Sequence, residues 1–92
     1  MTKMEEKLIE LGYRRHQTYY YDTNKENKYT IYSKEYGCDL DIIIELLNNE
    51  KVDRHFLKNS YTEIEYLETI KRIKRAFNTM IKDIRELREC QD

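Results

Sequence analysis

The chain is short and almost neutral, with 92 residues, of which 39% are hydrophobic and 38% charged, and a formal net charge of -1. This amount of apolar material supports one domain over residues 1–92 and excludes a second core. The charge balance excludes the global field of a strongly basic nucleic-acid binder or an acidic DNA mimic, so electrostatic recognition has to be local.

The first predicted element is a short helix over Lys3–Leu11. Thr2 and Glu5 have the spacing of a capping box at its start. The apolar residues of one helical face recur at i, i+4 and i+7: Met4, Leu8 and Leu11. Gly12 then follows, where a residue in the left-handed conformation closes a helix.

Four strands are predicted next, because short runs rich in Tyr, Ile, Thr and Val alternate with polar clusters. Their ranges are Tyr13–Tyr21, Lys28–Ser33, Asp39–Leu47 and Lys51–Leu57. Short connections between them predict an antiparallel meander.

The third strand predicts which face of the sheet is buried. Its even positions are all apolar, so we expect the even face to be the core face. Its odd positions carry three acids that we expect to face water: Asp39, Asp41 and Glu45. In the fourth strand we expect Val52 and Phe56 to point inward and Asp53 and His55 outward.

The last predicted element is a long amphipathic helix that starts with a capping box at Ser60 or Thr62 and runs to about Glu89. Its apolar side chains form one broad arc: Tyr66, Ile70, Ile73, Phe77, Met80, Ile81, Ile84 and Leu87. The helix is on the order of 40 Å long, so its C-terminal turns either project from the domain or pack on something else. The whole pattern predicts an α+β fold of the order αββββα, with both helices on one sheet face.

Opposite the apolar arc, the long helix carries a basic stripe: Lys71, Arg75, Lys82 and Arg85. Such a stripe can bind phosphates or an acidic protein surface. The alternative is a solvated helix face held by i, i+4 ion pairs, such as Glu68 with Arg72 and Lys82 with Glu86.

Tyrosine is unusually frequent, with nine in the chain, and the first predicted hairpin is rich in it. Consecutive strand residues point to opposite faces, so the run Tyr19–Tyr21 cannot all be buried. Exposed tyrosines anchor protein interfaces and stack on the bases of single-stranded RNA. The candidate partner-binding tyrosines are Tyr19, Tyr21, Tyr32 and Tyr36. Alternatively, the tyrosines simply cover a sheet face that meets water.

The chain has no pattern typical of a catalytic, cofactor or metal site. The acids of the third strand are not a specific metal or catalytic signal, and neither is Cys38 paired with His16 or His55 as a nucleophile and base. We therefore expect a non-enzymatic protein with no metal and no cofactor. No secretory signal and no membrane span is recognisable, so we expect a cytoplasmic protein that does not enter membranes.

A resemblance adds to these patterns. Lys7–Tyr13, the Tyr-rich strands, Tyr61–Leu67 and Ala76–Asn78, together with abundant Lys, Ile, Tyr and Asn, resemble the small accessory proteins of phages and prophages in low-GC Gram-positive bacteria. The resemblance covers most of the chain and carries over no functional residues. It implies an accessory role such as that of an anti-CRISPR or other anti-defence inhibitor. Many such inhibitors are strongly acidic, so the near-neutral charge favours a blocker that acts by shape.

Three functional predictions follow. The first is a non-catalytic protein-binding module, an inhibitor of a host protein such as a CRISPR nuclease complex, that uses the tyrosine-bearing sheet face or the projecting helix end. The second is a nucleic-acid binder with the basic stripe on phosphates and the tyrosines on bases. The third is a homodimer formed through the long helix at Ile81, Ile84 and Leu87.

Overall fold

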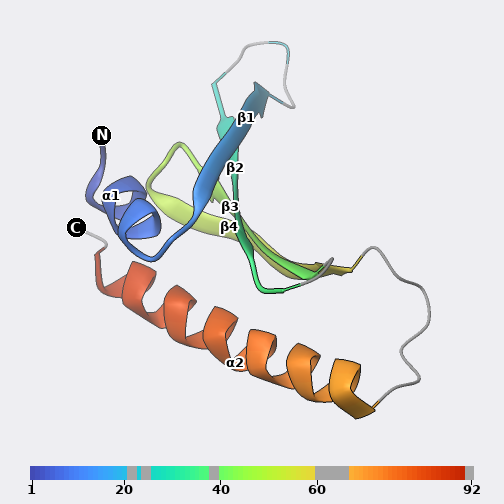
Figure 1. Cartoon of the computed structure of the whole chain (residues 1–92). Helices are drawn as coiled ribbons and strands as arrows, with labels where there is room; N and C mark the ends of the chain where they lie inside the picture. The colour runs from blue at the N-terminus through green and yellow to red at the C-terminus, as the bar shows by residue number, and fades with distance from the viewer. Residues whose placement is uncertain (21–22, 24–25, 38–39, 60–66, 91–92) are drawn as a thin grey trace.

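The chain folds in the predicted α+β order of one helix, four strands and one helix (Figure 1). The structure, a computed structural model, describes residues 1–20, 23, 26–37, 40–59 and 67–90, and the side chains of residues 67–69 are outside this description. The elements are α1 (Lys3–Glu10), β1 (Arg14–Tyr20), β2 (Lys28–Glu35), β3 (Leu40–Leu47), β4 (Lys51–Asn59) and α2 (Leu67–Glu89). The strands form one antiparallel sheet in the order β1-β2-β3-β4, which confirms the meander.

Helix α1 begins where its sequence predicts and ends at Glu10, one residue before the predicted end, with Leu11 as its C-cap. The Thr2 hydroxyl accepts a hydrogen bond from the Glu5 backbone N–H at 3.2 Å, and the Glu5 carboxylate accepts one from the Thr2 N–H at 2.8 Å. This reciprocal pair is a capping box, which satisfies two backbone donors at the helix start. Gly12 has a φ of 96° and turns the chain from α1 into β1.

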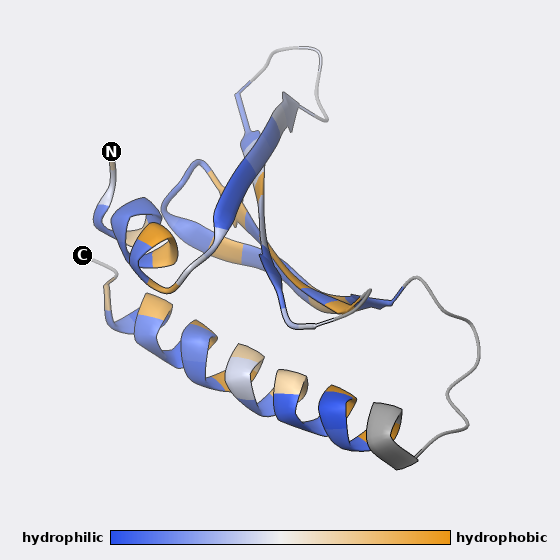
Figure 2. Cartoon of the chain, in the orientation of Figure 1, coloured by the Kyte–Doolittle hydropathy of each residue, from blue (hydrophilic) through white to orange (hydrophobic). Residues whose placement is uncertain are grey.

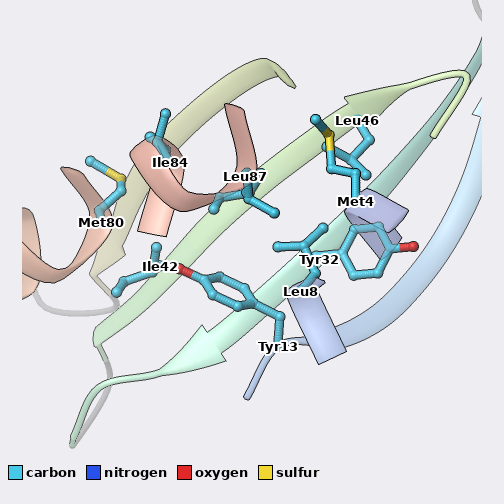
Figure 3. Packing of buried hydrophobic residues seen from close by; sticks show 10 residues of the cluster. Met4, Leu8, Tyr13, Tyr32, Ile42, Leu46, Met80, Ile84 and Leu87 are labelled. Carbon is cyan, nitrogen blue, oxygen red and sulfur yellow. The ribbon is translucent and has the colours of Figure 1, made fainter. Parts of the chain in front are cut away.

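The even face of β3 is the core face, as predicted. Ile42, Ile44 and Leu46 are each 0% exposed. Both helices cover this face, and the main core cluster includes Met4 and Leu8 from α1, and Met80, Ile84 and Leu87 from α2 (Figure 3). The prediction that both helices lie on one sheet face is therefore confirmed.

A β-bulge in β4 changes which of its side chains point inward. Glu45 pairs with Arg54 while Leu46 pairs with Val52, so Asp53 is an extra residue on β4. The alternation of sides is reversed after this residue. Val52 and Leu57 therefore pack against the core, whereas Phe56 lies on the opposite face and is 37% exposed. The prediction that Phe56 points inward is wrong for this reason.

Helix α2 does not bury its apolar arc uniformly. Its C-terminal half packs against the sheet and α1, so the C-terminal turns do not project (Figure 1). Ile84 and Leu87 are buried in that contact, and of the three residues predicted to form a homodimer only Ile81 is exposed. Apolar and hydrophilic residues alternate along α2 as the helix turns (Figure 2). The predicted capping residues Ser60 and Thr62, and Tyr66, lie outside the described residues.

In the part of the chain that the structure describes, neither helix has the length and apolarity needed to cross a membrane.

Candidate functional site

The basic stripe lies on the solvent side of α2. All four of its members are exposed: Lys71, Arg75, Lys82 and Arg85. The ion pairs found between described residues are Lys7 with Glu10 and Lys34 with Asp83, and neither involves the stripe. The ion pair expected between Lys82 and Glu86 is not formed, and Glu68 has no described side chain. The stripe is thus a cationic surface without carboxylate partners in the described structure.

A second feature of α2 is a row of exposed apolar side chains, which we call the apolar ridge. It consists of Ile70, Phe77 and Ile81, which are 48%, 46% and 46% exposed. Their spacings of seven and four residues place them in line along one side of the helix. Three large, half-exposed apolar side chains in line are more than the scattered apolar residues of an ordinary surface.

The ridge points away from the contacts that hold α2 to the sheet. On the opposite side of the helix, the Thr79 hydroxyl lies 3.5 Å from the Tyr36 hydroxyl, and Asp83 contacts Tyr13 and Lys34. Ile81 is two residues from both Thr79 and Asp83, which is about 200° around the helix axis. The rotation of α2 on the sheet therefore leaves the ridge in solvent.

A polar cluster ties α2 to the rest of the domain in this rotation. The Tyr13 hydroxyl donates a hydrogen bond to the Asp83 carboxylate at 2.8 Å, and the Lys34 ammonium lies 3.3 Å from the same oxygen, Oδ2. Lys34 also lies 5.3 Å from the centre of the Tyr13 ring, within cation–π range. Asp83 is 2% exposed, so these partners replace the water that its charge has lost.

Two core tyrosines have raised pKa values. Burial, followed by the hydrogen bond and the negative charge of Asp83, raises the pKa of Tyr13 far above its ordinary value. Burial, followed by the charge of Glu5, raises the pKa of Tyr32, against an opposing effect of Arg15. The two hydroxyls point in opposite directions in the core (Figure 3).

These shifts predict a loss of stability in alkali. Unfolded tyrosines ionise near pH 10, whereas folded Tyr13 and Tyr32 keep their protons to higher pH. The contribution of these tyrosines to the free energy of unfolding is complete below about pH 10. It is lost as the pH rises toward the folded pKa values, by up to about 1.4 kcal/mol per pH unit for each tyrosine. Urea unfolding at a series of pH values from about 8 to 11 measures the decline. The decline should be shallower in Tyr13→Phe, and an equal decline would contradict the assignment to Tyr13.

The face of the sheet away from both helices, called here the open face, carries the tyrosine pair Tyr19 and Tyr29. Their rings stack with centres 5.7 Å apart and planes at 21°. The Tyr19 hydroxyl donates a hydrogen bond to Glu45. Glu45 is 2% exposed, so the expectation that this acid faces water is wrong. The sequence contains no local signal for this contact, since Tyr19 and Glu45 lie two strands apart.

The other candidate tyrosines lie elsewhere. Tyr32 pairs with Ile44 on the core face and is 1% exposed, so it is a core residue and cannot bind a partner. Tyr36 is half-buried against the core, and its hydroxyl lies next to Thr79 of α2. Tyr21 lies outside the described residues. The structure therefore leaves Tyr19 on the open face and the basic stripe across the sheet from it, and it does not bring the two together.

The open face also has a hollow of about 380 Å³. It is lined by His16, Gln17, Ile31, Ser33, Asp41, Ile43 and Lys58. His16 and Ser33 are hydrogen-bonded there. Among the described residues, no carboxylate is hydrogen-bonded to His16, so this contact lacks the third member of a catalytic triad.

A larger hollow of about 810 Å³ lies where α1, the β3–β4 turn and the end of α2 meet. Its lining includes the free thiol of Cys90, which donates a hydrogen bond to the Glu86 carbonyl at 3.4 Å. No three His, Cys, Asp or Glu side chains gather in a metal-binding group within the described ranges. Cys38 and Asp39 fall outside those ranges.

Comparison of the chain with protein-family models, with curated protein sequences and with solved structures finds no match.

Proposed function

We propose that this protein is a non-catalytic protein-binding module whose partner docks on the solvent side of α2. The observation that carries the proposal is the apolar ridge, in which Ile70, Phe77 and Ile81 are each almost half exposed. Covering the exposed half of such a side chain contributes roughly 1 kcal/mol. Three in line, beside arginines, form the kind of centre that protein interfaces use.

A more specific identity rests on the resemblance alone. Small phage and prophage accessory proteins include inhibitors of host defence, so we propose a host protein, such as a CRISPR nuclease complex, as the target. The near-neutral net charge of -1 supports a blocker that acts by shape over one that imitates DNA.

Capture from a lysate of a low-GC Gram-positive host tests the proposed function. Immobilised wild-type protein is compared with Phe77→Glu and with Ile9→Glu. Ile9 is a matched control because it is 49% exposed but belongs to α1. We expect a host protein that is retained by wild type and by Ile9→Glu and lost with Phe77→Glu. Capture of no protein, or of the same protein by Phe77→Glu, would count against docking at the ridge.

Nucleic acid is the second candidate, and the unpaired cations of the basic stripe favour it. Lys71, Arg75 and Lys82 are exposed on one side of α2 and could contact successive phosphates. Tyr19 lies on the open face, away from the basic stripe. A nucleic-acid strand bound to the stripe would have to pass around the sheet before its bases could stack on Tyr19.

Fluorescence anisotropy with single- and double-stranded DNA and RNA tests this second candidate. Binding at low salt should weaken steeply as salt is added, and Arg75→Glu should weaken it further. No binding to any of these probes at low salt removes nucleic acid as a ligand.

A further inference from the structure

We infer that the partner presents an acidic amphipathic α-helix that lies along the apolar ridge of α2. This inference rests on the proposed function and adds the chemistry of the partner to it. Three observations carry it: the straight course of the ridge, the sign of the charges that border it, and the secondary structure that presents it.

The course of the ridge fits a helix. Ile70 and Ile81 are eleven residues apart, so the ridge spans on the order of 16 Å along the axis of α2. Between Ile70 and Phe77 lies Ile73, which is half-buried. The spacings of three and four residues among these side chains are those of a heptad pattern. A straight row with these spacings receives the side chains of a second helix packed nearly along it. An added β-strand would need free backbone donors and acceptors, which the middle of a helix does not offer.

The charges that border the ridge are positive. Lys74 is four residues after Ile70, and Arg85 is four residues after Ile81, so each is a neighbour of a ridge residue on the helix surface. Arg88 lies seven residues after Ile81, further along the same line. All three cations are exposed, and none has an ion-pair partner among the described residues. A carboxylate-bearing helix would complement this border.

A second copy of this chain fits the ridge less well. When two ridges pack antiparallel, the borders that carry Lys74 and Arg85 lie on the same side of the contact in both copies. Like charges brought together in this way oppose association. Nucleic acid also fits less well, since the ridge places apolar side chains where a phosphate backbone would lie.

Designed peptides are the direct test of this inference. The probe is a labelled helical peptide of about three heptads, with Leu at the a and d positions and Glu at the flanking positions. A peptide of the same composition with its leucines scattered is one control, and a peptide with Lys in place of Glu is the other. By fluorescence anisotropy at low salt, the acidic amphipathic peptide should bind at least about tenfold more tightly than either control.

Variants locate the binding on the ridge and its border. Phe77→Glu should weaken binding of the acidic peptide at least about tenfold, and Ile9→Glu should leave it unchanged. The double variant Lys74→Glu, Arg85→Glu should lose the acidic peptide and gain the lysine peptide, because the sign of the border is reversed. Both changes are at exposed positions, and circular dichroism checks that the variants keep the wild-type fold.

Four results would overturn the inference. The first two are equal binding of the amphipathic and scattered peptides, and no gain of the lysine peptide by the charge-reversed variant. Sedimentation that shows a dimer dissolved by Phe77→Glu would make a second copy the occupant. Binding of single-stranded RNA that is lost with Phe77→Glu would make nucleic acid the occupant of the ridge. If the peptides fail while Phe77 is still required for capture from lysate, the proposed function stands and the class of partner is wrong. If capture also fails, the proposed function falls with it.

Discussion

Replacing Leu87 with alanine is expected to lower the free energy of unfolding by about 3 kcal/mol. Leu87 is 0% exposed and lies in the core cluster between α2, α1 and β3. The smaller side chain would leave a cavity that the other members of the core cluster, such as Met4, Leu8 and Ile42, fill incompletely. A domain of this size has a total stability of roughly 5 to 10 kcal/mol, so the variant should unfold at a clearly lower concentration of urea.

Ile81→Ala is the matched control, since Ile81 is on the same helix and in the same apolar arc but is 46% exposed. Its cost should stay under about 1 kcal/mol, because half of the side chain is already in water and alanine favours the helix. Equal costs at the two positions would contradict the division of α2 into a core side and a ridge. The comparison therefore measures the same feature on which the proposed function depends.

Asp83→Ala is expected to cost about 3 kcal/mol of stability. The change removes the acceptor of the Tyr13 hydroxyl and the ion-pair partner of Lys34, and it leaves a buried hydroxyl and an ammonium group without their partner. Because this cluster also ties α2 to Tyr13 and Lys34, the loss should be accompanied by faster hydrogen exchange in the helix. Chemical unfolding and amide exchange measure the two effects.

Glu89→Ala is the control for this prediction. Glu89 is an exposed acid in the last turn of α2, where the helix dipole disfavours a negative charge. Its removal should be neutral or slightly stabilising. A double-mutant cycle of Asp83→Ala with Tyr13→Phe should give a coupling of about 1 kcal/mol or more, and the absence of coupling would show that the hydrogen bond contributes nothing.

The candidate surfaces were only partly foreseeable. The exposure of Lys71, Arg75, Lys82 and Arg85 follows from their position opposite the apolar arc, and the structure agrees. The prediction that Tyr32 binds a partner is wrong because Tyr32 is aligned with the core residue Ile44, and this register depends on the pairing of β2 with β3. Glu45 could not be identified as buried, since its cover comes from another strand.

The sequence by itself determined the order and type of the elements. The capping box at Thr2, the left-handed Gly12, the apolar even positions of β3 and the long apolar periodicity of α2 are each set by residues close together in the chain, and each appears in the structure. Short connections then allow only near neighbours to pair, so the meander follows from local information as well.

Only the tertiary structure decided which apolar residues are buried. The apolar arc of α2 is wider than the contact that one sheet face can make, so its periodicity is equally compatible with Ile81 or Leu87 in the core. The choice was made by contacts between distant segments: α1 covers the C-terminal half of α2, and Asp83 is held by Tyr13, 70 residues away in sequence. Those contacts leave Ile70, Phe77 and Ile81 exposed to solvent. The candidate docking surface can therefore be identified from the fold and not from the sequence.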